Sequence, residues 1–247
     1  MFLEMTWLRK MLLSAILLLI PWCAFTKVYM VSVGVADYPG ESSDLSLPAA
    51  DARVVTWLYT ESTDIMYCML LDDEATKARI KAAMKQVFAM ADAEDIVVFF
   101  FSGHGFPGGF CAYDGNLSYK DIRNAMSKSR STRKMIFADA CFSGKIRTEG
   151  PNARLEISAA KNADVMLFLS SRSDEISYEG KDMVNGYFTT YLQKGLRGGA
   201  DVDRNRVITA RELFEYVHQN VVYISGGNQH PVMWGRFPDD MPVMNWK

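Results

Sequence analysis

Two stretches decide the fold, residues 96–105 (IVVFFFSGHG) and residues 134–144 (KMIFADACFSG). Each begins with an apolar run of strand length and ends in a short glycine-containing turn, which carries His104 in the first stretch and Cys141 in the second. Continuous apolar runs of this kind are typical of strands buried on both faces of a parallel sheet. A thiol and an imidazole at two strand ends are the minimum parts of a cysteine nucleophile with its base.

Strand-like and helix-like segments alternate along the rest of the chain. This alternation predicts an α/β fold with a mostly parallel central sheet of about six strands and helices on both faces, and 247 residues suit one such domain. The expected strands are 27–35, 65–71, 95–101, 135–139, 165–170 and 232–234, and the expected helices are 47–60, 75–90, 119–127, 186–196 and 209–223.

The carboxyl ends of parallel strands meet at one edge of a sheet, where ligands collect. One right-handed crossover fits between His104 and Cys141, so their strands can be neighbours about 4.8 Å apart. His104 would then exchange a proton with the thiol or the departing amine, and the backbone N–H groups of Gly105 and Cys141 would bind the oxyanion. The alternative is a buried cysteine and an unrelated loop histidine.

Asp139 bears on the substrate, because residues i and i+2 of a strand share a face and Asp139 precedes Cys141 by two positions. A carboxylate beside a nucleophilic thiol would raise the pKa of the thiol, which harms catalysis. A counter-charge for a cationic substrate explains it better, since a carboxylate 4 Å from Arg or Lys contributes about 4 kcal/mol at an effective dielectric of 20. The alternative is a strand-end aspartate that accepts hydrogen bonds from loop amides.

Several motifs together resemble those of the caspase-like cysteine peptidases of family C14, specifically the bacterial metacaspase-like branch. The histidine and cysteine motifs are residues 101–105 (FSGHG) and 139–144 (DACFSG). Residues 33–40 (VGVADYPG) are similar to the family's first strand and turn, 47–52 (LPAADA) to its first helix start, and 170–175 (SSRSDE) to the segment after its fifth strand. The resemblance covers nearly all of residues 27–247.

The resemblance implies a caspase-hemoglobinase fold and peptide hydrolysis through a thioester. It also implies an acidic pocket for Arg or Lys before the cut, and the matching positions are Asp51, Ser102 and Asp139. Residues 41–44 hold no arginine, so cleavage after Asp is not expected. Asp51 has another reading, as an acid stabilised by the dipole at a helix start. A different preference before the cut and a catalytically silent caspase-like binding scaffold are the alternatives for the whole protein.

Phe142 departs from the family pattern, because many eukaryotic metacaspases have His there. Between residues 145 and 163 the chain carries Lys145, Arg147, Arg154 and Lys161, in the region where relatives are cut between their two subunits. An enzyme specific for basic residues could process itself there, and a solvated surface loop is the alternative.

The first 26 residues are expected to be a signal peptide, which predicts a secreted or periplasmic protein. Arg9 and Lys10 precede an apolar stretch of secretory type, residues 11–20, which is too short to span a bilayer. The mature chain would start near residue 25 or 27, and an uncleaved membrane anchor is the alternative. The net charge is −2, so no nucleic-acid partner is expected.

Cysteines and histidines limit the other chemistry. If Cys23 leaves with the signal, Cys68, Cys111 and Cys141 remain, and an odd count leaves at least one free thiol, with a Cys68–Cys111 disulfide left open. The chain has three histidines, and neither His218 nor His230 has a partner at ligand spacing, so no zinc site is expected. The chemistry requires no cofactor.

Calcium is considered as an activator. Asp201, Asp203, Asn205 and Glu212 match positions 1, 3, 5 and 12 of an EF-hand loop, but Arg206 stands where the sharp turn requires Gly. The alternative is a capping box formed by Thr209 and Glu212 at the start of the last helix.

Overall fold

A computed structural model describes residues 26–40, 43–106, 108–142, 164–172, 175, 177–178 and 184–246, with the backbone alone at positions 141 and 142. Residues 1–25 of the expected signal peptide (1–26) and the basic segment 145–163 lie outside the described residues. Within the described part of the chain, no helix is both long enough and apolar enough to cross a membrane.

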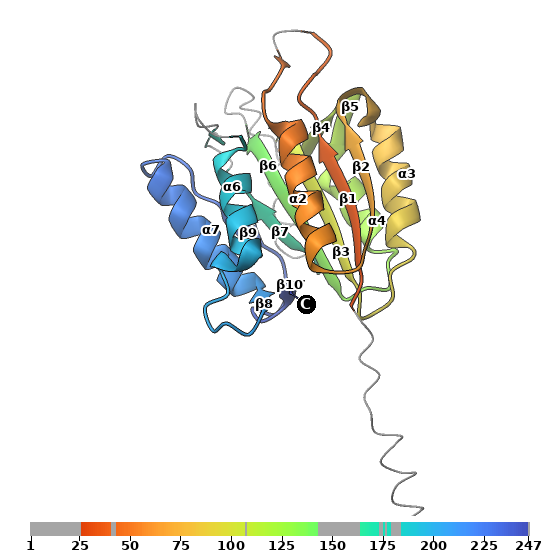
Figure 1. Ribbon diagram of the computed structural model, residues 1–247. Helices are drawn as coiled ribbons and strands as arrows, with labels where there is room; N and C mark the ends of the chain where they lie inside the picture. Colours follow the sequence, from red (N-terminus) through yellow and green to blue (C-terminus); the bar gives the residue numbers. More distant parts are fainter. Residues whose placement is uncertain are drawn as a thin grey trace, which may run out of the picture.

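A central sheet organises the molecule (Figure 1), and its strand order is β2-β1-β3-β6-β7-β9. All neighbouring pairs are parallel except β7–β9, which is antiparallel. The strands of this path are β1 (Val28–Gly34), β2 (Ile65–Leu71), β3 (Ile96–Phe106), β6 (Arg133–Phe142), β7 (Met166–Leu169) and β9 (Val232–Trp234). This confirms the expected six-stranded, mostly parallel sheet.

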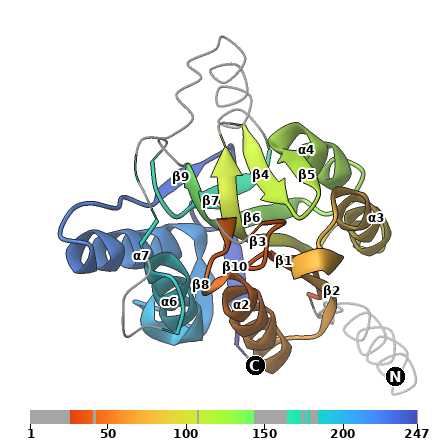
Figure 2. The same ribbon diagram turned by 90° about the horizontal axis from the view of Figure 1, so that it is seen from above.

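Helices cover both faces of the sheet, as Figure 2 shows from above. α3 (Lys77–Phe88) and α4 (Tyr119–Met126) bury their apolar sides against one face. α2 (Pro48–Ser62), α6 (Tyr187–Lys194) and α7 (Ala210–Ile224) pack on the other face. A three-residue 3-10 turn follows β2 (Asp72–Glu74), and a short π-helical turn follows α6 (Gly195–Gly199).

The helix starts follow from local chemistry. Pro48 occupies the first turn of α2, where its missing N–H leaves no bond unmade. Thr76 caps α3 by accepting a hydrogen bond from the Arg79 amide, and Ser118 forms a capping box with Asp121 at α4. These caps fix where the helices begin and therefore how the loops leave the strand ends.

Three features of the fold were not expected. A hairpin of β4 (Gly109–Ala112) and β5 (Gly115–Ser118) extends the sheet from the end of β3, and β8 (Val207–Thr209) pairs with β10 (Pro242–Asn245) in a separate two-stranded sheet. β3 and β6 also run further than predicted. Because β4 pairs with Gly105 and Phe106, and β6 stays paired up to Phe142, the two glycine segments continue the strands instead of breaking them.

Candidate active site

The carboxyl ends of β3 and β6 bring the two candidate catalytic residues together. His104 and Cys141 are direct partners in the parallel register, and Ser102 and Asp139 are partners two residues earlier. Because side chains two residues apart on a strand share a face, all four positions belong to one patch of the sheet. The structure thus supplies the pairing register of β3 and β6, which the sequence alone does not determine.

A backbone carbonyl and a tyrosine orient His104. Its Nε2 lies 2.8 Å from the carbonyl oxygen of Ser43, which can only accept a hydrogen bond, so Nε2 carries the proton. The lone pair of the neutral ring is then on Nδ1, which leaves Nδ1 as the proton acceptor. The Tyr38 ring packs against the imidazole with the centroids 4.8 Å apart.

Tyr38 also ties the histidine segment to the hairpin. Its hydroxyl accepts a hydrogen bond from the His104 amide (2.9 Å) and donates one to the Cys111 carbonyl (2.9 Å). Burial raises the pKa of Tyr38 well above its usual value, so the hydroxyl stays protonated and able to donate. Gly103 permits this approach, since its φ is +150° and an added Cβ would lie 2.6 Å from the Tyr38 hydroxyl.

Asp51 is buried in the first turn of α2, and its carboxylate reaches across to β3 and to the start of α6. It accepts hydrogen bonds from the Ser102 hydroxyl (2.8 Å), the Asn185 side-chain amide (2.7 Å) and the Gly186 backbone amide (3.3 Å). α2 has no side-chain cap at its start, so Asp51 does not cap the helix. The structure brings Asp51 and Ser102 into direct contact.

Asp139 is the second buried carboxylate of this region. Its Oδ1 accepts from the Ser177 hydroxyl (2.6 Å), and its Oδ2 accepts from both the backbone amide (3.1 Å) and the hydroxyl (2.8 Å) of Thr189. Asp139 thus accepts structural hydrogen bonds, but the amide among its donors belongs to α6 and not to a loop, as the alternative had expected. The Ser170 side chain also contributes a hydrogen bond to this carboxyl group, so most of the about four lone-pair sites of the carboxylate are used.

Gly186 sits between the two carboxylates. Its amide donates to Asp51, and a Cβ added to it would lie 2.5 Å from Oδ2 of Asp139, closer than real contacts allow. Only glycine lets the start of α6 approach both acids. Asp51 and Asp139, with the residues that bond them, are called the acid pocket below.

Burial and proximity change the ionisation of both acids. Burial, together with repulsion from Asp139, raises the pKa of Asp51 to about 8. Burial also raises the pKa of Asp139, against the lowering effect of its bonds to Ser177 and Thr189. Two buried carboxylates that interact in this way do not both ionise readily, so the empty acid pocket retains a proton at neutral pH.

Gly105 is part of β3 and pairs with Phe110 on one side and Phe142 on the other. That the backbone amides of Gly105 and Cys141 bind the oxyanion stays a prediction. Cys68 and Cys111 are free thiols, so no disulfide joins them.

The candidate calcium residues lie near one another at the turn before α7. The carboxylates of Asp201, Asp203 and Glu212 lie within 4.8 Å of one another. Asp201 and Asp203 accept from backbone amides of their own loop, Asn205 among them, and Glu212 completes the predicted capping box with Thr209. Arg206, at the position that favours Gly, has a φ of +67°. These bonds account for the loop, and calcium binding stays a prediction.

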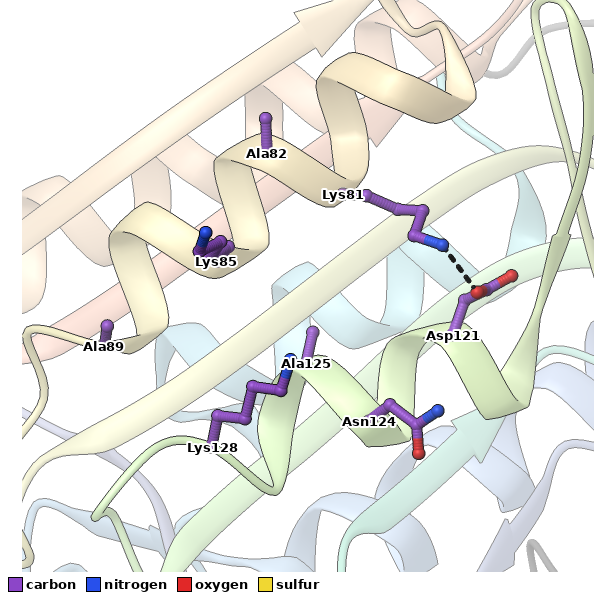
Figure 3. Close-up of a pocket in the computed structure, with 8 residues that line it drawn as sticks. All are labelled: Lys81, Ala82, Lys85, Ala89, Asp121, Asn124, Ala125 and Lys128. Atoms are coloured by element: carbon purple, nitrogen blue, oxygen red, sulfur yellow. Dashed lines mark hydrogen bonds and ion pairs between the residues drawn. The ribbon is translucent and has the colours of Figure 1, made fainter.

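Two further findings concern residues outside the site. His230 bonds Glu175 through Nδ1 (2.7 Å), a side-chain partner that spacing along the chain did not indicate. A groove of about 540 Å³ between α3 and α4 is lined by Lys81, Lys85 and Lys128, and Lys81 is bonded to Asp121 at 2.8 Å (Figure 3). The two helices that form this groove pack on the sheet face opposite α2 and α6, and none of the lining residues belongs to the acid pocket.

Sequence reasoning missed the residues that hold the candidate site. Tyr38 and Ser43 orient His104, whereas Ser177, Asn185 and Thr189 bond the two acids. The turn residues around Tyr38 gave the one available signal, as part of the VGVADYPG motif. Polar residues in a loop carry no signal of their own.

Known proteins were compared with this arrangement. No protein with a curated description matches the chain. Protein GSU0716 from Geobacter sulfurreducens is similar in structure, with a TM-score of 0.64, 16% sequence identity and coverage of 90% of this chain and 100% of that one. Caspase-1 from Spodoptera frugiperda has a TM-score of 0.63 and 13% identity, covering 85% of this chain and 86% of that one. The structure of pro-sf-caspase-1 has a TM-score of 0.62 and 14% identity, with coverage of 88% and 94%.

At these identities the structural likeness establishes the caspase fold and nothing finer. The family comparison is independent of it. The model of the caspase domain, peptidase family C14, matches residues 29–241, which run from the second residue of β1 past the end of β9 and include all the candidate catalytic and pocket residues. The chain therefore belongs to the caspase domain family.

Proposed function

We propose that this protein is a cysteine endopeptidase that hydrolyses peptide bonds after Arg or Lys, with Cys141 as the nucleophile and His104 as its base and acid. The observation that carries the proposal is the register of β3 and β6, which makes His104 and Cys141 direct neighbours beside a buried pair of carboxylates. Membership of the caspase domain family supports a cysteine peptidase in general.

The reaction would proceed in two steps. Nδ1 of His104 takes the thiol proton, and the Cys141 sulfur attacks the carbonyl carbon of the bond to be cut. The C–N bond then breaks, the imidazolium gives its proton to the departing amine, and a thioester remains. In the second step water loses a proton to His104 and attacks the thioester, which releases the carboxylate and restores the thiol.

The acid pocket is the proposed site for the basic side chain. Asp139 belongs to the same sheet face as the catalytic positions, and Asp51 of α2 bonds Ser102 on that face. The two carboxyl groups offer negative charge to a basic side chain, and the three bonds of Asp51 leave about one acceptor site for it. A bound cation would also compensate the repulsion between the two carboxylates. We therefore propose Arg or Lys as the residue before the cut, and protein or peptide chains as substrates.

Fluorogenic peptides ending in Arg, Lys or Asp test the proposal directly. Turnover after Arg and Lys, its absence after Asp and its loss in Cys141→Ala are expected. Cys68→Ala is the matched control, because Cys68 is a free thiol of β2 and should keep full activity. Cleavage after Asp alone would overturn the assignment of the acid pocket. A complete lack of cleavage, with both full-length and processed protein, would overturn the proposal that the protein is an enzyme.

Three further proposals need their own tests. Residues 1–26 are proposed as a signal peptide, and amino-terminal sequencing of exported protein would locate the cut. Self-cleavage within residues 145–163 is tested by comparing fragments from active protein and Cys141→Ala. Calcium is proposed as an activator, and equal peptide turnover with calcium and with a chelator would refute this role.

A further inference from the structure

A second concave surface lies beside the acid pocket. It is a groove of about 480 Å³ between α2 and the edge strand β2, and one end of it is formed by the residues that precede α6. Trp57 and Val54 of α2 line one wall, Tyr67 and Met69 of β2 line the other, and Val184 and Asn185 close the end. In Figure 1 α2 and β2 appear on either side of the β1 arrow.

The groove exposes large apolar side chains to solvent. Trp57 is 69% exposed, Tyr67 48% and Val184 78%. Scattered exposed apolar residues are ordinary, but three of them lining one concave surface mark a binding site for something apolar. The large apolar residues of α2 outside the groove, Val55, Leu58 and Tyr59, are buried, so Trp57 is the large apolar residue of this helix that the fold leaves exposed.

The groove and the acid pocket are continuous through one residue. Asn185 lines the groove and donates its side-chain amide to Asp51 at 2.7 Å, and Gly186, the next residue, donates to the same carboxylate. On α2, Ala50 lines the groove and Asp51 follows it in the chain. A ligand that fills the acid pocket therefore lies one residue from the end of the groove.

Charge separates the two sites. Arg53 lines the groove and makes no ion pair with any residue that the structure describes, whereas the acid pocket contains two carboxylates and no cation among its bonded residues. A basic side chain is attracted to the pocket and repelled from the groove. The two sites thus suit different side chains of one peptide.

We infer that the groove binds an apolar or aromatic side chain of the peptide substrate, two residues away from the basic residue held in the acid pocket. An extended peptide rises about 3.3 Å per residue and places side chains i and i+2 on the same side, about 7 Å apart. Two sites that share a wall at Asn185 suit two such side chains on one side of the peptide. The inference rests on the proposed function, because it presupposes that a basic side chain enters the acid pocket.

Matched peptides test it, each with Arg before the cut and with Phe, Gly or Lys two positions away on one side of that Arg. A second set varies the position two residues away on the other side. Phe is expected to raise kcat/KM about tenfold over Gly on one of the two sides, from partial burial of one aromatic ring, and Lys should be no better than Gly. Trp57→Ala should remove this advantage and leave the Gly peptide unchanged. Tyr223→Ala, which alters an 84% exposed residue of α7 outside the groove, is the control.

The outcomes separate the two proposals. Equal cleavage rates for Phe and Gly peptides in both sets, or a Phe advantage that survives Trp57→Ala, would overturn the proposed role of the groove. The peptidase proposal would be unaffected. If nothing is cleaved, equilibrium binding of the same peptides to Cys141→Ala decides: tighter binding of the Phe peptide, lost with Trp57→Ala, supports the groove without turnover. Equal affinities there would refute it.

Discussion

The acid pocket should make substrate affinity depend on pH in the neutral range, where an ordinary aspartate is already fully ionised. Burial and the repulsion from Asp139 raise the pKa of Asp51 to about 8, so the empty pocket keeps a proton that a bound guanidinium would displace. An Arg side chain stays charged throughout the range from pH 6 to 9. Raising the pH should therefore strengthen binding of an Arg peptide.

The magnitude follows from the fraction of Asp51 that is ionised. With a pKa of about 8, that fraction is about 1% at pH 6 and about half at pH 8. If only the ionised form binds Arg, the apparent dissociation constant falls about fiftyfold between these two pH values. At pH 7 the same reasoning predicts the release of about 0.9 proton for each peptide bound.

Binding to Cys141→Ala isolates this effect from turnover. An amino-terminally acetylated peptide ending in Arg would be titrated by fluorescence anisotropy from pH 6 to 9, and calorimetry in phosphate and Tris would give the number of protons released. Asp51→Asn is the control variant. Its carbonyl can accept from Asn185 and Gly186, and its amide can donate to the Ser102 hydroxyl. Asp51→Asn should bind more weakly, with no dependence on pH over this range.

Stability of the empty protein should vary in the opposite direction. The folded-state pKa of Asp51 lies above its unfolded value of 3.8, so its contribution to stability is complete below about pH 4 and is lost as the pH rises through 8. Thermal melts of the wild type and Asp51→Asn would reveal this slope. An affinity that does not change from pH 6 to 9, or a slope that Asp51→Asn retains, would refute the reasoning.

Three other substitutions probe the supports of the site. Gly186→Ala introduces a Cβ 2.5 Å from Oδ2 of Asp139, which should displace one charge-assisted hydrogen bond and lower kcat/KM for Arg peptides at least tenfold. Circular dichroism would show that the variant is folded, and unchanged kinetics would contradict the close approach. Thr189→Val removes the hydroxyl that donates to Asp139, so the KM of Arg peptides should rise severalfold, while Thr189→Ser should restore it; equal KM values in both variants would rule out that role. Tyr38→Phe leaves the His104 amide and the Cys111 carbonyl without their hydrogen-bond partner. This should lower kcat and reduce the free energy of unfolding by about 1–3 kcal/mol. A variant as stable and active as the wild type would show that the hydroxyl is dispensable.

The sequence predicted those parts of the fold that depend on local pattern. Apolar runs located the six strands of the central sheet, and Pro48 and the Thr209–Glu212 capping box marked helix starts. The hairpin of β4 and β5 was missed because each of its strands has only four residues and begins with glycine, which strands disfavour. The true ends of β3 and β6 were missed because their last residues are held by pairing partners from other segments, which local propensity does not contain.

The candidate site divides in the same way. His104, Cys141 and Asp139 carried recognisable chemistry at strand ends, and the family motifs added Asp51 and Ser102. Asn185 and Thr189 could not be found, because they reach the acids only when α6 packs beside α2 and β6, far away in the chain. A serine or an asparagine in a loop, or a threonine in a helix, has many ordinary reasons to be there, so its residue type alone does not distinguish a pocket residue.

The start of α6 explains how two buried carboxylates can be tolerated next to each other. Its amides at Gly186 and Thr189 point one to each acid, and its positive dipole end favours negative charge there. These bonds lower the pKa of each carboxyl group, but burial and mutual repulsion outweigh them, so the pocket is left with a proton where a cation would fit better. Selectivity for a basic residue would then come from the relief of an electrostatic penalty that the empty fold already carries. A pocket in which more donors satisfied both acids would be more stable, and it would gain less from binding Arg.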